Sequence, residues 1–404
     1  MSPSSPGPSL LTLSPEELLA RLEASGLRGR GGGWFPAARK WRAVRAEGGT
    51  PLVVANGAEG EPGSIKDRHL MRTRPAEVLS GLALAARGVG AREAVVFLKA
   101  SFAPEADSLR RALAEGASSA GLSVRVAHGD DSYVVGEETA LLESLEGRRP
   151  WPRPKPPLPA AVGFEGRPTL IHNVETLLRL NAALVDPAAF RATETTFVSL
   201  WGDVGRCGLH EVPLGTPLRR VVERGEEAPD GVSFVLPGGP SSPALAFGQL
   251  DTPLDPDALR AAGSGLGTAS LLVAGRSRDP FDLAVSVAAF FERESCGQCP
   301  PCVRGTESLH KVMRALRTRE AKARDVADID EVAGFMAMHG YCAHCRAGAG
   351  AVTRLVALNR PRIEDVLTAT GPAPRSAGRT TGGDSFDPFA PGSPQRRAIE
   401  ALLP

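Results

Sequence analysis

The sequence predicts an α/β protein built from three successive domains, and three observations predict it. Over residues 51–147, apolar strand-like runs alternate with helical segments, which is typical of βαβ units and a mainly parallel sheet. Over residues 197–275, a hairpin signal around Gly205 and Gly208 favours a small α+β domain. Over residues 280–368 the pattern becomes helical, which indicates a helical bundle.

The first domain, expected over residues 14–190, begins with a capped helix. Ser14 is the expected N-cap, Pro15 takes the first helical position and Glu17 completes a capping box. The expected strands are 52–55, 94–98 and 123–127, and the expected helices are 75–87, 104–120, 137–145 and 173–183. A proline-rich connector over 150–159 must be extended.

The other two domains are expected over residues 195–276 and 280–370. The second domain has expected strands at 197–201, 209–212, 233–236 and 270–274, with a short helix from Pro217. The third has expected helices at 281–294, 301–318, 325–339 and 347–358. The Ser/Pro-rich residues 1–13 are expected to be disordered, and residues 371–404, rich in Gly, Pro, Ser and Arg, are expected to form a flexible tail.

Composition excludes several classes of function. Hydrophobic residues make up 42% of the 404-residue chain and charged residues 23%, and the formal net charge is +1. This balance gives no reason to expect nucleic acid or an anionic membrane as a partner. The sequence has neither an apolar run near the ~20 residues that span a bilayer nor a secretory signal, so a cytoplasmic protein without a transmembrane segment is expected.

The cysteines indicate a metal centre. Cys296, Cys299 and Cys302 form a C-x2-C-x2-C run that can direct three thiolates at a [4Fe–4S] cluster, and Cys342 is the expected fourth ligand. The alternative is a zinc site of Cys299, Cys302, Cys342 and Cys345, which leaves Cys296 unexplained. The cluster is favoured, although it leaves Cys345 unexplained.

Two further segments have the chemistry of a ligand site. The glycine-rich loop, residues 26–33, lacks side-chain bulk, so its amides can approach a phosphate, with Arg30 and Lys40 as sources of charge. Asn56 begins a polar turn after the first strand, where α/β sheets bind ligands. Tyr133-Val-Val-Gly-Glu-Glu138 opens a helix, whose N-terminus favours an anion.

Together these stretches resemble the flavin- and NADH-binding subunit of respiratory complex I, the ~51-kDa type, a module also found in NAD-reducing hydrogenases and NAD-dependent formate dehydrogenases. The resemblance covers roughly residues 15–370. It is carried by GLRGRGG, NGAEGEPGSIKDR, YVVGEETALLESLEGRRPWPRPKPPLPA, NVETL, EVPLGTPLR and ESCGQCPPCVRGT.

The resemblance implies an N-terminal Rossmann-like domain for FMN and NADH, a β-grasp-like soluble-ligand-binding (SLBB) domain, and a helical domain whose cluster has Cys342 as fourth ligand. Glu61 and Glu138 are the catalytic candidates. Gly29, Arg30, Gly31 and Lys40 are expected on the phosphate side, and Phe35 and Glu61 on the nicotinamide side. The rest of the site is expected to consist of Asn56, Tyr133, Gly136, Glu137, Glu138, Asn173 and Thr176.

The chain departs from this family mainly around the nucleotide. The family stacks the NADH adenine between two phenylalanines, where this chain has Ala43 and Leu158. A family glycine is replaced by Trp34, an acidic residue by Ala58, and an asparagine by His172. Cys345 stands where the family has glycine.

The leading hypothesis is an NADH dehydrogenase-type oxidoreductase subunit. It would pass electrons between NAD(P)H, FMN and the [4Fe–4S] cluster to a protein acceptor such as a ferredoxin or another redox subunit, with a peripheral place in a membrane complex as one setting. The alternative is a non-catalytic electron-transfer adaptor that keeps the cluster and flavin but has lost NADH binding. A third hypothesis is a zinc-stabilised binding protein without redox function.

Overall fold

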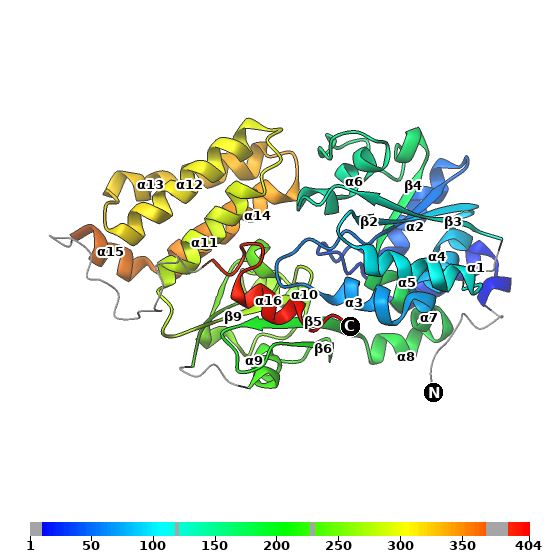
Figure 1. Ribbon diagram of the computed structural model, residues 1–404, viewed down its shortest axis with the longest axis horizontal. Coiled ribbons are helices and arrows are strands. Elements are labelled where there is room, and N and C mark those ends of the chain that lie inside the picture. Colours follow the sequence, from blue (N-terminus) through cyan, green and yellow to red (C-terminus); the bar gives the residue numbers. More distant parts are fainter. Residues whose placement is uncertain (1–9, 118–120, 227–230, 369–386) are drawn as a thin grey trace.

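The first sheet confirms the expected parallel arrangement. The computed structural model describes residues 10–117, 121–226, 231–368 and 387–404 (Figure 1). Within them, four parallel strands pair in the order β3-β2-β1-β4. They are β1 (Leu52–Asn56), β2 (Glu93–Lys99), β3 (Ser123–Gly129) and β4 (Thr169–Asn173). The sequence prediction missed β4, which follows the proline-rich connector.

Both faces of this sheet are covered. Alternate residues of β1 point to opposite faces of the sheet and belong to two hydrophobic cores. Val53 and Ala55 lie in the core on one face, and Leu52 and Val54 lie in the core on the other face. The helices of the first domain are α1 (Pro15–Ser25), α2 (Ala37–Glu47), α3 (Lys66–Thr73), α4 (Pro75–Val89), α5 (Ala103–Ala114), α6 (Glu138–Leu145), α7 (Val174–Val185) and α8 (Pro187–Ala192). Of these, α2, α4, α5, α6 and α7 contact the sheet directly. The capping box at the start of α1 is confirmed, since Ser14 and Glu17 bond each other's backbone amides.

The second sheet is mixed, and its hairpin is confirmed. In the described residues its strand order is β6-β5-β9-β7-β8, with β5 parallel to β9 and the other pairs antiparallel. The strands are β5 (Thr195–Gly202), β6 (Gly208–Pro213), β7 (Val232–Leu236), β8 (Leu245–Ala246) and β9 (Ser270–Gly275), and the short helices are α9 (Leu218–Val222) and α10 (Pro256–Ala261).

The C-terminal region is helical, as expected. Its helices are α11 (Pro280–Arg293), α12 (Pro300–Thr318), α13 (Ala323–His339), α14 (Ala343–Leu358) and α15 (Arg360–Thr368). Figure 1 shows α11 to α14 lying beside one another. In the part of the chain described here, no helix has the length and apolar character needed to cross a bilayer.

The two terminal predictions need correction. Residues 387–404 are not a flexible tail: they include α16 (Pro394–Glu400), which lies against β5. Phe389 and Ile399 are fully buried, and Phe389 packs edge-on to Trp201, so apolar burial outweighs the tail-like composition. At the other end, Leu10–Thr12 form a 3-10 turn with Leu10 buried. The rest of both predictions, residues 1–9 and 371–386, lies outside the described residues.

Candidate active site

A cavity of about 830 Å³ lies at the carboxyl ends of β1 and β4. Asn56 and Asn173 end these neighbouring strands in register, and both residues line the cavity. The glycine-rich loop and α2 form one wall. Residues 241–243 and 264–268 of the second domain and the start of α14 also contribute. All three domains therefore meet at this cavity.

Most of the predicted binding residues are brought together here. Those lining the cavity are Gly29, Gly31, Phe35, Lys40, Asn56, Glu61, Tyr133, Gly136, Glu137, Glu138, Asn173 and Thr176. Ala43, Ala58, Leu158 and His172, the positions of departure on the nucleotide side, line it too. The sequence motifs thus converge although they lie far apart along the chain.

Arg30 is the exception, and its predicted place beside the phosphate is corrected. Its side chain is 1% exposed and does not line the cavity. The guanidinium instead pairs with Glu194, immediately before the second domain. Its backbone N–H does support the site, because it donates to Thr176 Oγ1 at 2.8 Å.

The glycine-rich loop is closed on itself and lies close to β4. The N–H of Gly29 donates to the carbonyl of Phe35 at 2.9 Å. A Cβ on Gly31 would lie 3.3 Å from Asn173 Cβ, so a side chain here would meet the end of β4. Gly32 has a φ of +103°, a conformation that disfavours other residues. These positions leave backbone exposed toward the cavity.

Two lysines and two glutamates form the charged edge of the cavity. Glu138 accepts hydrogen bonds from Lys40 Nζ at 3.2 Å and Lys155 Nζ at 2.8 Å. Burial favours the neutral acid, but the two lysine charges outweigh it and hold the pKa of Glu138 at about 2. Glu137 caps α6 by accepting from the N–H groups of Thr139 and Ala140. Glu138 is therefore an ionised group that holds Lys40, which suits a positioning role better than proton transfer.

Glu61 is a protonatable carboxyl of the site. It is buried, and its Oε2 accepts hydrogen bonds from Tyr133 Oη at 2.8 Å and Ser241 Oγ at 2.9 Å. The Ser241 N–H donates to Oε1 at 3.1 Å. Burial raises the pKa of Glu61 to about 7, although these hydrogen bonds oppose the increase. The carboxyl can therefore gain or lose a proton near neutral pH.

We expect Glu61 to make the cofactor-free protein less stable as pH rises. Its folded pKa lies above its unfolded value of 4.5, so the folded state binds the proton more tightly. Stability should fall by about 3 kcal/mol between pH 4.5 and 7 from this group, at about 1.4 kcal/mol per pKa unit. Urea unfolding of the cofactor-free protein across this range should show the decline, and Glu61→Gln should remove it. An equal decline in the variant would contradict the assignment.

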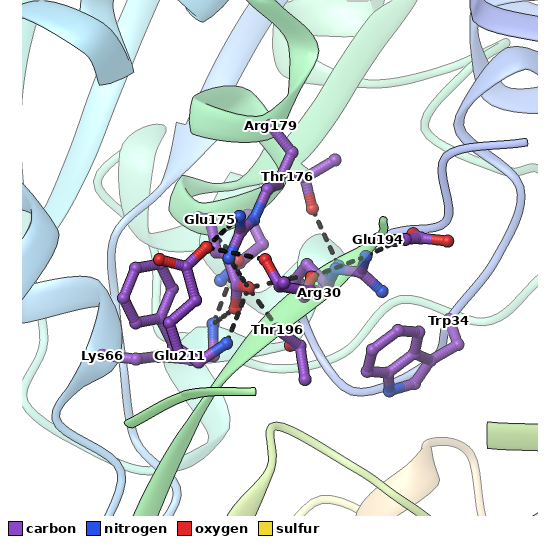
Figure 2. A network of polar contacts seen from close by, with 12 residues as sticks. Arg30, Trp34, Lys66, Glu175, Thr176, Arg179, Glu194, Thr196 and Glu211 are labelled. Carbon is purple, nitrogen blue, oxygen red and sulfur yellow. Dashed lines mark hydrogen bonds and ion pairs between the residues drawn. The ribbon is translucent and has the colours of Figure 1, made fainter. Parts of the chain in front are cut away.

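The sequence prediction missed a buried charged cluster beneath the glycine-rich loop. Lys66 Nζ lies 2.8 Å from Asp67 Oδ1 and 3.3 Å from Glu175 Oε2. Arg179 Nη2 lies 3.4 Å from Glu175 Oε1, and Arg30 Nε lies 4.0 Å from it (Figure 2). Asp67 also accepts from Asn173 Nδ2 at 2.6 Å. Lys66 and Asp67 lie in the NGAEGEPGSIKDR motif and Glu175 in NVETL. Nothing in the sequence of these motifs indicated that the charged side chains would be buried.

The cysteines gather at the ends of the C-terminal helices. Cys296 lies in the loop between α11 and α12, Cys299 is the N-cap of α12 and Cys302 lies in its first turn. Cys342 is the N-cap of α14 and also lines the cavity. Cys345 is fully buried, and its thiol donates to the Met336 carbonyl at 3.3 Å. Cys342 is therefore the thiol shared by the cavity and the cysteine region.

The donor set fits a cubane cluster better than a single zinc ion. Among the described residues, no three Cys, His, Asp or Glu side chains converge as one bound ion would need. A cubane is larger and takes one thiolate at each iron, and the four thiols of Cys296, Cys299, Cys302 and Cys342 match that number. Two contacts also hold the segment that carries these cysteines: Ser295 Oγ lies 3.5 Å from Cys302 Sγ, and Trp151 Nε1 donates to the Cys296 carbonyl at 3.2 Å.

Aromatic side chains fill the space between the cavity and the cysteines. The Tyr133 ring packs edge-on to Phe290 at 5.1 Å and lies 5.6 Å from His344. His344 bonds the Phe291 carbonyl through Nε2 at 2.9 Å, and burial lowers its pKa. These contacts hold the start of α14 against the cavity wall.

Comparison with known families agrees with this division of the chain. The Nuo51 FMN-binding domain matches residues 22–182. The iron–sulfur binding region of NADH-ubiquinone oxidoreductase-F matches residues 282–365, which contain Cys296, Cys299, Cys302 and Cys342. The second of the NADH-quinone oxidoreductase F subunits of Rhizobium meliloti is 36% identical over 82% of this chain and 84% of its own length. The chain belongs to the family of NADH-quinone oxidoreductase F subunits.

Members of this family from other sources extend the match. The F subunit of the Rickettsia bellii oxidoreductase is 34% identical over 88% of this chain and 91% of its own. An NAD⁺-reducing [NiFe]-hydrogenase in its H₂-reduced state has a similar fold, with a TM-score of 0.83 and 32% identity. The similarity covers 88% of this chain and 64% of the hydrogenase chain. FMN and a [4Fe–4S] cluster are thus the cofactors of this oxidoreductase family member.

Proposed function

We propose that this chain takes electrons from NAD(P)H at the cavity and delivers them through the cysteine region to a protein acceptor. The observation that carries the proposal is the position of Cys342, which lines the cavity and belongs to the matched iron–sulfur region. Bound FMN would accept a hydride and release single electrons, and the [4Fe–4S] cluster would take them one at a time.

The residues of the cavity have distinct proposed roles. The backbone of Gly29 and Gly31, together with Lys40, would bind the flavin phosphate, because the loop lacks side-chain bulk there and Lys40 carries the charge. Asn56, Asn173 and Thr176 would orient the flavin from the sheet. Tyr133, Gly136, Glu137 and Glu138 would line the side formed by α6 and its preceding turn.

Glu61 is the proposed proton-handling group, and Phe35 the proposed nicotinamide neighbour. The pKa of Glu61 near 7 suits the proton that accompanies two-electron reduction of a flavin. Phe35 is 43% exposed at the cavity and has Arg39 over its ring at 5.1 Å. An exposed aromatic ring at the entrance offers a stacking surface for a planar nucleotide ring.

We also propose a fold type for the first two domains and an assembly in which the chain acts. We assign residues 14–190 to a Rossmann-like domain and 195–276 to a β-grasp-like SLBB domain, supported by the parallel and mixed sheets respectively. The acceptor would be a ferredoxin-like or other redox subunit of a cytoplasmic or peripheral complex. The relatives named above, a component of a quinone oxidoreductase and a hydrogenase, support such an assembly.

Anaerobic NADH titration tests the proposal. The purified protein should be brown, absorb broadly near 400 nm and release FMN on denaturation. Addition of NADH under argon should bleach the flavin band, and NADPH in parallel should define nucleotide preference. A bound flavin that stays oxidised with both nucleotides would favour the non-catalytic adaptor. The physical reason would be Ala43 and Leu158, which line the cavity where the family has two phenylalanines that stack the NADH adenine. Colourless protein with stoichiometric zinc would overturn both hypotheses.

A further inference from the structure

Trp34 leaves the glycine-rich loop and enters the second domain. Its side chain is 3% exposed and belongs to a core whose other members lie between Val198 and Val273. The indole Nε1 donates to the Gly267 carbonyl at 2.8 Å. A residue of the cavity wall is therefore built into the core of a different domain.

The backbone of Trp34 is in an unfavourable conformation for a bulky residue. Its φ is +49°, a left-handed value that glycine adopts readily. Burial of the large indole and the hydrogen bond to Gly267 offset this cost. A residue keeps such an unfavourable backbone conformation only where the surrounding structure holds it, and such residues are common at ligand sites.

Trp34 also stabilises the buried Arg30. The Arg30 guanidinium lies 4.2 Å from the centre of the Trp34 ring (Figure 2). Arg30 Nε and Nη1 have no hydrogen-bond partner among the described residues, so the indole face provides electrostatic compensation for the buried cation. The other terminal nitrogen, Nη2, pairs with Glu194 and donates to the Thr195 carbonyl at 3.4 Å, where the second domain begins.

Arg28 completes the attachment. Its Nε donates to the Trp34 carbonyl at 2.8 Å, and its Nη1 lies 2.7 Å from Asp257 on α10. Arg28, Arg30 and Trp34 thus contact the second domain through their side chains. Between them, Gly29, Gly31 and Phe35 line the cavity. Separation of the two domains would move the cavity wall directly.

We propose that Trp34 is a positioning residue that fastens the glycine-rich loop to the second domain and so keeps the FMN cavity formed. The inference rests on the proposed location of FMN in this cavity. It gives the second domain a role in cofactor retention, because the groups that hold the loop belong to its core and surface.

Flavin affinity and protease sensitivity test this role in the full-length protein. Trp34→Gly should weaken FMN binding at least tenfold, measured by the recovery of flavin fluorescence on dilution. Trp34→Phe keeps a ring over Arg30 but loses the N–H donor, and it should recover most of the affinity. In the flavin-free protein, trypsin should cut after Arg28 or Arg30 at least fivefold faster in Trp34→Gly than in wild type.

Val221→Ala is the matched control, because Val221 is fully buried in the same core on α9. It should lower thermal stability yet leave FMN affinity within twofold and the trypsin sites protected. Equal loss of FMN in Val221→Ala and Trp34→Gly would overturn the positioning role, as would unchanged affinity in Trp34→Gly. If wild type binds no FMN, the proposed function fails, and the trypsin rates alone support or overturn the attachment.

Discussion

Cys342→Ala should abolish the iron–sulfur chromophore. Removing this thiol deletes the expected fourth ligand and opens the cluster at the side that faces the cavity. Iron should fall from about four per chain toward zero, because one iron of the cubane would be left without its protein thiolate. Iron analysis and electron paramagnetic resonance of the dithionite-reduced protein measure the loss, while FMN content reports whether the first domain is intact.

Cys345→Ala is the matched control, three residues along the same helix. Cys345 is fully buried; its thiol donates to the Met336 carbonyl and also contacts the Cys302 thiol. We expect this variant to keep its iron and its spectrum. Loss of iron in Cys345→Ala with retention in Cys342→Ala would show that the fourth ligand is Cys345.

Glu175→Gln should destabilise the protein by about 3–5 kcal/mol, because it removes one partner from a buried ion cluster. Glu175 is fully buried and faces Lys66, Arg179 and Arg30. An amide keeps the shape but leaves three buried cations with less negative charge. Urea unfolding of the cofactor-free protein at pH 7 measures the effect.

The pH dependence of the same variant provides a second readout. Burial favours the neutral acid, but the charges of Lys66, Arg179 and Arg30 outweigh it and hold the pKa of Glu175 below 4.5. Wild type should therefore gain stability from this carboxylate above pH 4.5 and lose it as pH falls through the folded pKa. Glu175→Gln should lack that acid-dependent loss. Glu16→Gln, at an exposed pair with Arg45, is the control and should behave like wild type.

Several features were predictable because they depend on neighbours in the sequence. The capping box at Ser14 and the strands beginning near residues 52, 94 and 123 follow from local patterns, and the structure confirms them. The rule that parallel strands present ligands at their carboxyl ends predicted a site after Asn56, and the family resemblance implied that Tyr133 and Glu138 share it; all three line one cavity. Strand β4 was missed because its pairing partner β1 lies far earlier in the chain.

The C-terminal segment shows why composition alone misled. Residues 371–404 are rich in Gly, Pro, Ser and Arg, which is typical of a disordered tail. Phe389 and Ile399 nevertheless find buried positions beside β5 and the third domain. These two apolar anchors, together with the ion pair between Arg293 and Asp387, hold residues 387–404 against distant strands and helices.

The cysteine spacing by itself favoured a [4Fe–4S] cluster over zinc, and the resemblance of the motifs to the complex I subunit implied FMN; the family matches bear out both cofactors. Tertiary structure decided where the long side chains of the glycine-rich loop go. Arg30 was expected to bind a phosphate, yet its buried guanidinium pairs with Glu194, which lies 164 residues away in the sequence. Trp34 was a large side chain in a loop next to the ligand, yet its indole is buried in the core of the second domain. The direction of a flexible side chain depends on partners that only the folded chain brings near.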